Sequence, residues 1–108
     1  MQSANNLHVM EHARELALQV YRATSQFPSA ERFGLTAQMR RSAISIGSNI
    51  AEGCGRQGDR ELVRFLQMAL GSASELEFQA KIAEDLGFLS ARAPAAEKRQ
   101  PSFFFLTF

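Results

Sequence analysis

The sequence contains few of the residues that build cross-linked or membrane-bound scaffolds, with one cysteine, three prolines and no tryptophan among 108 residues. The single cysteine, Cys54, excludes an internal disulfide and a cysteine-rich fold. No apolar run approaches the roughly 18–20 residues that span a membrane. Residues 1–6 lack the basic and apolar segments of a signal peptide. We therefore expect a cytosolic protein with no membrane partner.

The charge is nearly balanced overall but is unevenly distributed along the chain. There are 12 Lys and Arg against 11 Asp and Glu, a net charge of +1. Over residues 32–64 six arginines face three carboxylates, whereas over residues 65–86 one lysine faces four carboxylates. Together with a 45% apolar share, this balance is typical of one small folded domain and excludes a highly charged disordered tail.

Apolar residues recur at three- and four-residue steps in three stretches, which predicts an all-α fold with three clear helices. The first helix is expected over about residues 7–25, because Phe27-Pro28 ends the pattern. The second is expected to begin near Thr36 as its N-cap, or a turn earlier at Ser29, and to run to about Glu52.

Glycines at positions 53, 55 and 58 are expected to break this second helix. Asp59 is a plausible N-cap for a third helix that runs to Leu86, with Gly87 as its C-terminal stop. At 1.5 Å per residue the third helix would be about 42 Å long. Since the first two helices are shorter, either a fourth helix or a neighbouring subunit is expected to cover the rest of its length.

The chain after Leu89 has no clear helical period. Four of the nine phenylalanines fall in the last seven residues. We expect this segment to pack into a groove of this subunit or of a neighbouring one. The alternatives are a disordered end or a β-type aggregation segment. The predicted organisation is a helical bundle domain over residues 1–89 and an atypical C-terminal tail over residues 90–108.

Polar residues form a stripe along the second predicted helix, at steps of three or four, and two more on the third helix are able to face it. We interpret this set as a hydrogen-bonded network that fixes helix register, with Arg41 paired to Glu52 or Glu75. The alternative is a ligand site. On the first interpretation, Glu75→Ala would destabilise the fold by about 2 kcal/mol or more. The network comprises Gln38, Arg41, Ser45, Asn49, Glu52, Ser72 and Glu75.

Arginines repeat every four residues after the second helix, and one more on that helix extends them into a basic strip. Such a strip can neutralise phosphates, which gives nucleic-acid binding that weakens steeply with salt. The alternative is a solvated face on which the arginines pair with Asp59 and Glu61. The candidate nucleic-acid-binding residues are Arg40, Arg56, Arg60 and Arg64.

No pattern predicts catalysis, a metal site or a cofactor. The segment 53–58 is rich in glycine but lacks the Gly-Lys-Ser/Thr ending of a phosphate loop, so we expect a turn between helices. His8 and His12 are four residues apart, but no third ligand accompanies them, so surface histidines are expected. Cys54 has no nearby histidine in the sequence to activate it.

Three segments carry a resemblance to a known family: FPSAERFGLTAQMRRSA at 27–43, SIGSNIAEG at 45–53, and the apolar and acidic positions from Phe65 to Phe88. In order and spacing they resemble the four-helix-bundle proteins encoded in intervening sequences of bacterial 23S ribosomal RNA genes. The accessory variability protein of diversity-generating retroelements is similar to this family. The resemblance extends over residues 7–89, and the sequence departs from the family after Leu89, where a fourth amphipathic helix is expected and none is readable.

The resemblance implies an antiparallel four-helix-bundle-like protomer that assembles into a ring-shaped homopentamer and has no catalytic activity. It also implies contact with nucleic acid, either RNA or DNA, and with a protein partner such as a reverse transcriptase. Our leading hypothesis is therefore a non-enzymatic accessory protein that contacts nucleic acid through its arginines. The alternative is a protein-interaction scaffold with no nucleic-acid affinity.

Overall fold

The structure, a computed structural model, describes residues 4–90 and the side chains of residues 6–90. Its elements are α1 (Ala4–Thr24), the short 3-10 helix η1 (Ser29–Glu31), α2 (Leu35–Cys54) and α3 (Asp59–Asp85). Over residues 4–90 there is no β-strand, which confirms the all-α fold class with three helices. The predictions for the tail and for a fourth helix fall on residues 91–108, outside the described residues.

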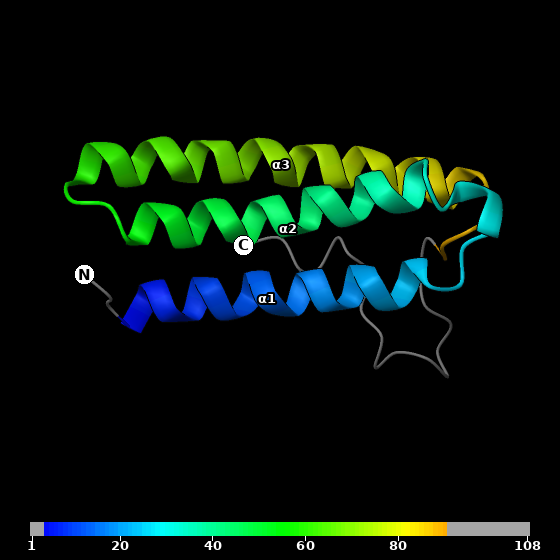
Figure 1. The fold of residues 1–108 in the computed structure, drawn as a ribbon, viewed down its shortest axis with the longest axis horizontal. Helices are drawn as coiled ribbons and strands as arrows, with labels where there is room; N and C mark the ends of the chain where they lie inside the picture. The colour runs from blue at the N-terminus through cyan, green and yellow to red at the C-terminus, as the bar shows by residue number, and fades with distance from the viewer. Residues whose placement is uncertain (1–3, 91–108) are drawn as a thin grey trace.

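The three helices run side by side, and α2 lies between α1 and α3 (Figure 1). Each helix is antiparallel to its neighbour, since the chain reverses direction at both connections. Within residues 4–90, no Cα of α1 comes within 8 Å of a Cα of α3, whereas both helices pack closely on α2. The central helix therefore carries both helix–helix interfaces.

The beginning of α2 differs from the prediction. Neither Thr36 nor Ser29 caps it: the N-cap is Gly34, Thr36 is buried inside the helix, and Ser29 begins η1. The side chain of Glu31 instead accepts a hydrogen bond from the backbone N–H of Leu35, with 3.3 Å between Oε1 and N. A carboxylate at this position also interacts favourably with the helix dipole, so the capping acceptor comes from the preceding turn.

The end of α2 is later than predicted, because Gly53 lies inside the helix and is buried. A Cβ at this position would lie 2.9 Å from the Cβ of Phe65 and 3.3 Å from Cδ1 of Leu62. Gly53 is therefore a site where α3 approaches the α2 backbone closely, and it does not break the helix. The reversal occurs after Gly55, and Gly58, with φ of 91°, completes it.

At α3, the predicted N-cap is wrong and the predicted C-terminal stop is confirmed. Asp59 is the first residue of the helix and not its N-cap, which is Gly58. Gly87 does end the helix, with φ of 82°. The N–H of Phe88 bonds the carbonyl of Ala83 at 2.8 Å, and the N–H of Gly87 bonds that of Glu84 at 3.0 Å, the pattern of a Schellman motif. The Phe88 ring then packs against Phe27, with the centroids 5.5 Å apart, so the end of α3 docks on the α1–α2 connection.

The predicted apolar stripes form the hydrophobic core, and each helix contributes to it. Complete burial of a Val, Leu, Ile, Phe or Met side chain stabilises a fold by about 1.5–3 kcal/mol. None of the described helices is long and apolar enough to cross a membrane. The core residues are Ala13, Leu16, Val20, Met39, Ala43, Ile46, Ile50, Phe65, Ala69, Leu76, Ala80 and Ala83, among others.

Candidate functional site

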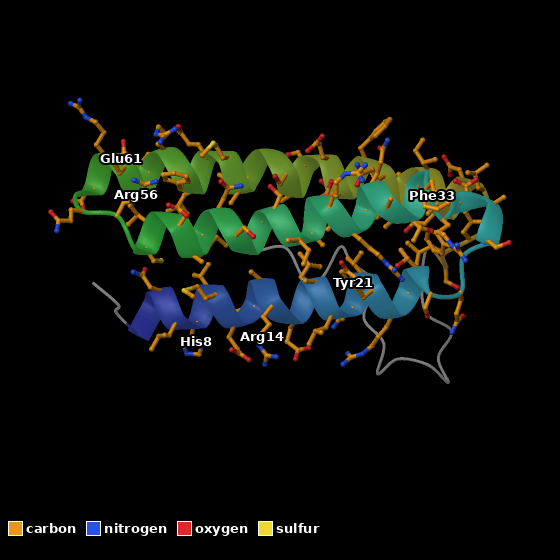
Figure 2. The ribbon with its side chains drawn as sticks, in the orientation of Figure 1. His8, Arg14, Tyr21, Phe33, Arg56 and Glu61 are labelled. Carbon is orange, nitrogen blue, oxygen red and sulfur yellow. The ribbon has the colours of Figure 1, made fainter. Side chains whose placement is uncertain are left out.

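Two of the predicted nucleic-acid-binding arginines meet at the α2–α3 connection. The guanidinium carbon of Arg56 lies 5.2 Å from the centroid of the Phe65 ring, and that of Arg64 lies 4.6 Å from it. Arg56 and Glu61 are seen together at this end of the molecule in Figure 2. The structure therefore brings Arg56 and Arg64 together around one buried aromatic ring, at cation–π distance.

Both of these arginines are paired with carboxylates of the same chain. Arg56 donates a hydrogen bond to Glu52 with 2.8 Å between nitrogen and oxygen, and Arg64 lies 3.3 Å from Glu61. Arg60 is exposed and makes no ion pair in the part of the chain that the structure describes. Three arginines and three carboxylates therefore share this surface, and of the pairs expected for a solvated face, Arg64–Glu61 is present, whereas Asp59 makes no ion pair within residues 4–90.

Arg40 lies apart from this group, toward the opposite end of α2. It is partly buried, its Nε donates to Oγ1 of Thr24 at 2.8 Å, and its Nη2 donates to the carbonyl of Tyr21 at 3.2 Å. Its guanidinium carbon also lies 4.5 Å from the centroid of the Tyr21 ring, which faces α2 in Figure 2. The side chain thus holds the last turns of α1 against α2 and does not belong to a continuous basic strip.

Three of the seven residues of the predicted polar network bond to one another at the α2–α3 interface. The hydroxyl groups of Ser45 and Ser72 are 2.8 Å apart and share a hydrogen bond. Asn49 donates to the carbonyl of Ser45 at 2.9 Å and to its hydroxyl oxygen at 3.1 Å. These contacts lie at the junction of two helices, where they support the interpretation of a network that fixes helix register.

The structure does not bring the other four residues of the network into it. Gln38, Arg41 and Glu75 are exposed, and Glu52 pairs with Arg56. Over residues 4–90 no ion pair joins Arg41 to Glu52 or Glu75. The expected pairing is wrong: Arg41 and Glu52 lie on one helix about 16 Å apart along its axis, and Glu52 pairs instead with Arg56, just beyond the end of α2.

Two features were missed by sequence reasoning. Gln79 of α3 is buried at 9% exposure, and its Oε1 finds no hydrogen-bond donor among the described residues. The second is a row of five uncharged residues on the side of α3 turned away from the core, which we name the outer stripe: Val63, Gln67, Leu70, Ser74 and Phe78. Val63, Leu70 and Phe78 are 49%, 60% and 67% exposed. The signal for the outer stripe in the sequence is a second set of apolar residues on this helix, at positions that do not belong to its core face.

The histidines lie as predicted, exposed on α1, and His8 is on the side turned away from α2 (Figure 2). Among residues 4–90 no three His, Cys, Asp or Glu side chains are grouped so as to hold a metal ion.

On α1, Arg14 hydrogen-bonds Glu11, and this contact lowers the pKa of the Glu11 carboxyl below its ordinary value. Cys54 is buried and unpaired by any disulfide.

Comparison with known protein families identifies the family of this chain. The family model described as 23S rRNA-intervening sequence protein matches residues 5–98. No curated protein matches the chain. The matched range covers α1 from its second residue and contains all of α2, α3 and the residues of the polar network, the arginines and the outer stripe.

Proposed function

Since the chain belongs to the 23S rRNA-intervening sequence protein family, we propose from its surfaces that it is a non-enzymatic helical scaffold that binds protein chains through the outer stripe of α3. The observation that carries this proposal is the contrast between two surfaces. The outer stripe exposes three large apolar side chains on one helix, whereas Arg56 and Arg64 are already paired with carboxylates. Apolar patches of this kind mark protein-binding sites more often than solvated faces do.

Protein capture that depends on the outer stripe tests this function. Tagged wild-type chain, a Leu70→Arg variant and a Leu7→Arg control would be purified from cells that produce the protein. Leu7 is 57% exposed on α1 and matches Leu70 in size and exposure. Each captured protein would be identified, purified and titrated against the three chains. We expect at least tenfold weaker binding for Leu70→Arg and unchanged binding for Leu7→Arg. Equal binding by all three chains would contradict the proposal.

A second candidate function, contact with nucleic acid, is favoured by the position of Arg56, Arg60 and Arg64 around one end of the molecule. The two ion pairs there are about half exposed, and exposed pairs contribute only about 0–1 kcal/mol. Phosphates would therefore displace the carboxylates at little cost. Arg40 is not part of this surface, since its contacts are with α1.

Salt dependence separates the two functions. Labelled structured RNA and duplex DNA would be titrated with the protein over about 50–200 mM salt, a range in which several phosphate contacts weaken binding strongly. An Arg56→Ala/Arg60→Ala/Arg64→Ala variant is expected to lose this binding, and an Arg22→Ala control on α1 is expected to keep it. Absence of binding at the lowest salt would leave the protein scaffold as the function.

The family resemblance extends the proposal to self-association, with a homopentamer as the implied assembly, and to a cytosolic location. A reverse transcriptase is one protein partner that we propose for this scaffold. Five copies of a 12.0 kDa chain have a mass that is readily separated from that of one or two, so light scattering on the purified protein measures the assembly directly.

A further inference from the structure

The two histidines of the chain lie about one turn apart on α1. His8 and His12 are the only histidines in the sequence, and both are exposed. Residues four apart on a helix are neighbours on its surface. Figure 2 shows His8 on the side of α1 turned away from α2, so His12 is expected on that side as well. Within residues 4–90 the only helix that α1 packs on is α2, and no described helix covers the pair.

This spacing allows both rings to bind one metal ion. Two imidazole nitrogens that each lie about 2.0–2.1 Å from a zinc ion are about 3 Å from each other. Rings whose Cβ atoms are about 5–6 Å apart on a helix reach that separation by rotation about side-chain bonds, without any change of the backbone. The same spacing of two histidines on one helix face holds zinc in proteins with the H-E-x-x-H motif.

The charges next to the pair do not oppose a bound cation. No Lys or Arg occurs over residues 4–13. The nearest arginine, Arg14, hydrogen-bonds the carboxylate of Glu11, which lies three residues after His8. The positive end of the helix dipole acts mainly within the first turn, and both histidines lie beyond the first turn of α1. A divalent ion therefore meets no uncompensated positive side chain beside His8 and His12.

We propose that His8 and His12 form a two-residue binding site for a divalent transition-metal ion such as Zn²⁺ or Ni²⁺. Imidazole nitrogen suits these ions, whereas Mg²⁺ and Ca²⁺ prefer oxygen ligands. The inference goes beyond the proposed scaffold function and is independent of it, since the outer stripe lies on α3 and the histidines lie on α1.

The site consists of two side chains and not three. Glu11 is engaged with Arg14. Glu15 lies seven residues after His8, about 10 Å along the helix axis, which is too far for both to reach one ion. This agrees with the absence of a three-residue metal cluster within residues 4–90. Structural zinc sites have four protein ligands and catalytic sites have three, so a pair holds the ion more weakly and leaves its other positions to water.

Calorimetric titration of the untagged chain with ZnCl₂ at neutral pH tests the site. We expect one zinc ion per chain, comparable binding of Ni²⁺, and no binding of Mg²⁺ at the same concentrations. His8→Ala and His12→Ala should each weaken zinc binding at least tenfold, because a single imidazole cannot chelate. In NMR spectra the imidazole protons of both residues should respond to the same equivalent of zinc.

A relocated histidine provides the matched control. Leu7→His/His8→Ala keeps two exposed histidines on α1, since position 7 is 57% exposed. It separates them by five residues, about 140° around the helix, so the two rings can no longer meet at one ion. This variant should bind zinc as weakly as His12→Ala does. Circular dichroism would show that each variant keeps its helices.

Equal zinc binding by the wild type and the relocated variant would overturn the inference, since the ion would then be bound elsewhere, for example by Cys54. A wild-type chain that binds no zinc at millimolar concentration would also overturn it. So would NMR spectra in which only one of the two rings responds to zinc.

Discussion

The guanidinium of Arg40 contacts Tyr21 twice, over its ring at 4.5 Å from the centroid and through a 3.2 Å hydrogen bond to its carbonyl. A third contact, from Nε to Oγ1 of Thr24, is 2.8 Å long. One side chain of α2 therefore joins the ring, the backbone and a buried hydroxyl of α1. Arg is suited to this role because its planar group has several donors in a fixed geometry, whereas Lys concentrates its charge at one point.

Arg40→Ala is expected to lower the free energy of unfolding by about 1–2 kcal/mol, from the lost hydrogen bonds and the lost cation–π contact. Urea unfolding measures this change. Arg40→Lys should recover less than half of it. Arg41→Ala, at the adjacent and exposed position, is the control and should stay within about 0.5 kcal/mol of wild type. Equal effects at the two positions would show that the contacts of Arg40 with α1 contribute nothing specific to stability.

The sequence predicts this fold well where local pattern decides and poorly where contacts between helices decide. Helical period identifies all three helices, because each has one apolar face. It cannot place the end of α2, since Gly53 stays within the helix and packs closely against Phe65 of another helix. It groups Arg40 with Arg56, although Arg40 lies near the start of α2 and Arg56 lies just beyond its end. The same period predicts polar residues facing α3 but not which of them reach a partner.

Gly53→Ala and Gly71→Ala are expected to have opposite effects on the stability of the isolated protomer. At Gly53 the new methyl group meets Phe65 at 2.9 Å, and forcing extra volume into a packed site typically costs about 1–3 kcal/mol. At Gly71 it meets open space, so the change should stabilise the helix by about 0.5–1 kcal/mol. Thermal unfolding at a concentration that keeps the chain monomeric measures both. Destabilisation by Gly71→Ala under those conditions would be inconsistent with an exposed glycine.

The hydrogen bond between Ser45 and Ser72 predicts coupling between these two positions. Each serine-to-alanine change should cost about 1 kcal/mol, and the double variant should cost less than the sum, because the shared bond is lost only once. A double-mutant cycle in urea measures the difference. Strictly additive effects would mean that the two hydroxyls do not interact in solution.

Glu75→Ala gives a separate prediction that contrasts with the polar-stripe interpretation. That interpretation expects a loss of about 2 kcal/mol or more. Since Glu75 is exposed and forms no ion pair within residues 4–90, the structure instead predicts a change within about 0.5 kcal/mol. The unfolding free energy in urea decides between these two values.

The hydrogen bond from Arg14 lowers the pKa of the Glu11 carboxyl below its ordinary value of 4.5. A carboxyl with a lower pKa in the folded chain stabilises the fold above the pKa of the unfolded chain, and this contribution is lost as the pH falls through the folded-state pKa. Carbon-detected NMR titration should therefore give a midpoint below 4.5 for Glu11, and Arg14→Ala should raise it. An identical midpoint in wild type and variant would contradict the contact.

The central place of α2 determines how the helices separate in partial unfolding. Because α1 and α3 meet only through α2 in the described residues, either outer helix can detach while the other interface stays closed. The amides of α2 then exchange with solvent only when both interfaces have opened, whereas those of α1 need only one such event. The slowest-exchanging amides should therefore belong to α2. A substitution in α2 is transmitted to both neighbours, and one in an outer helix to a single neighbour.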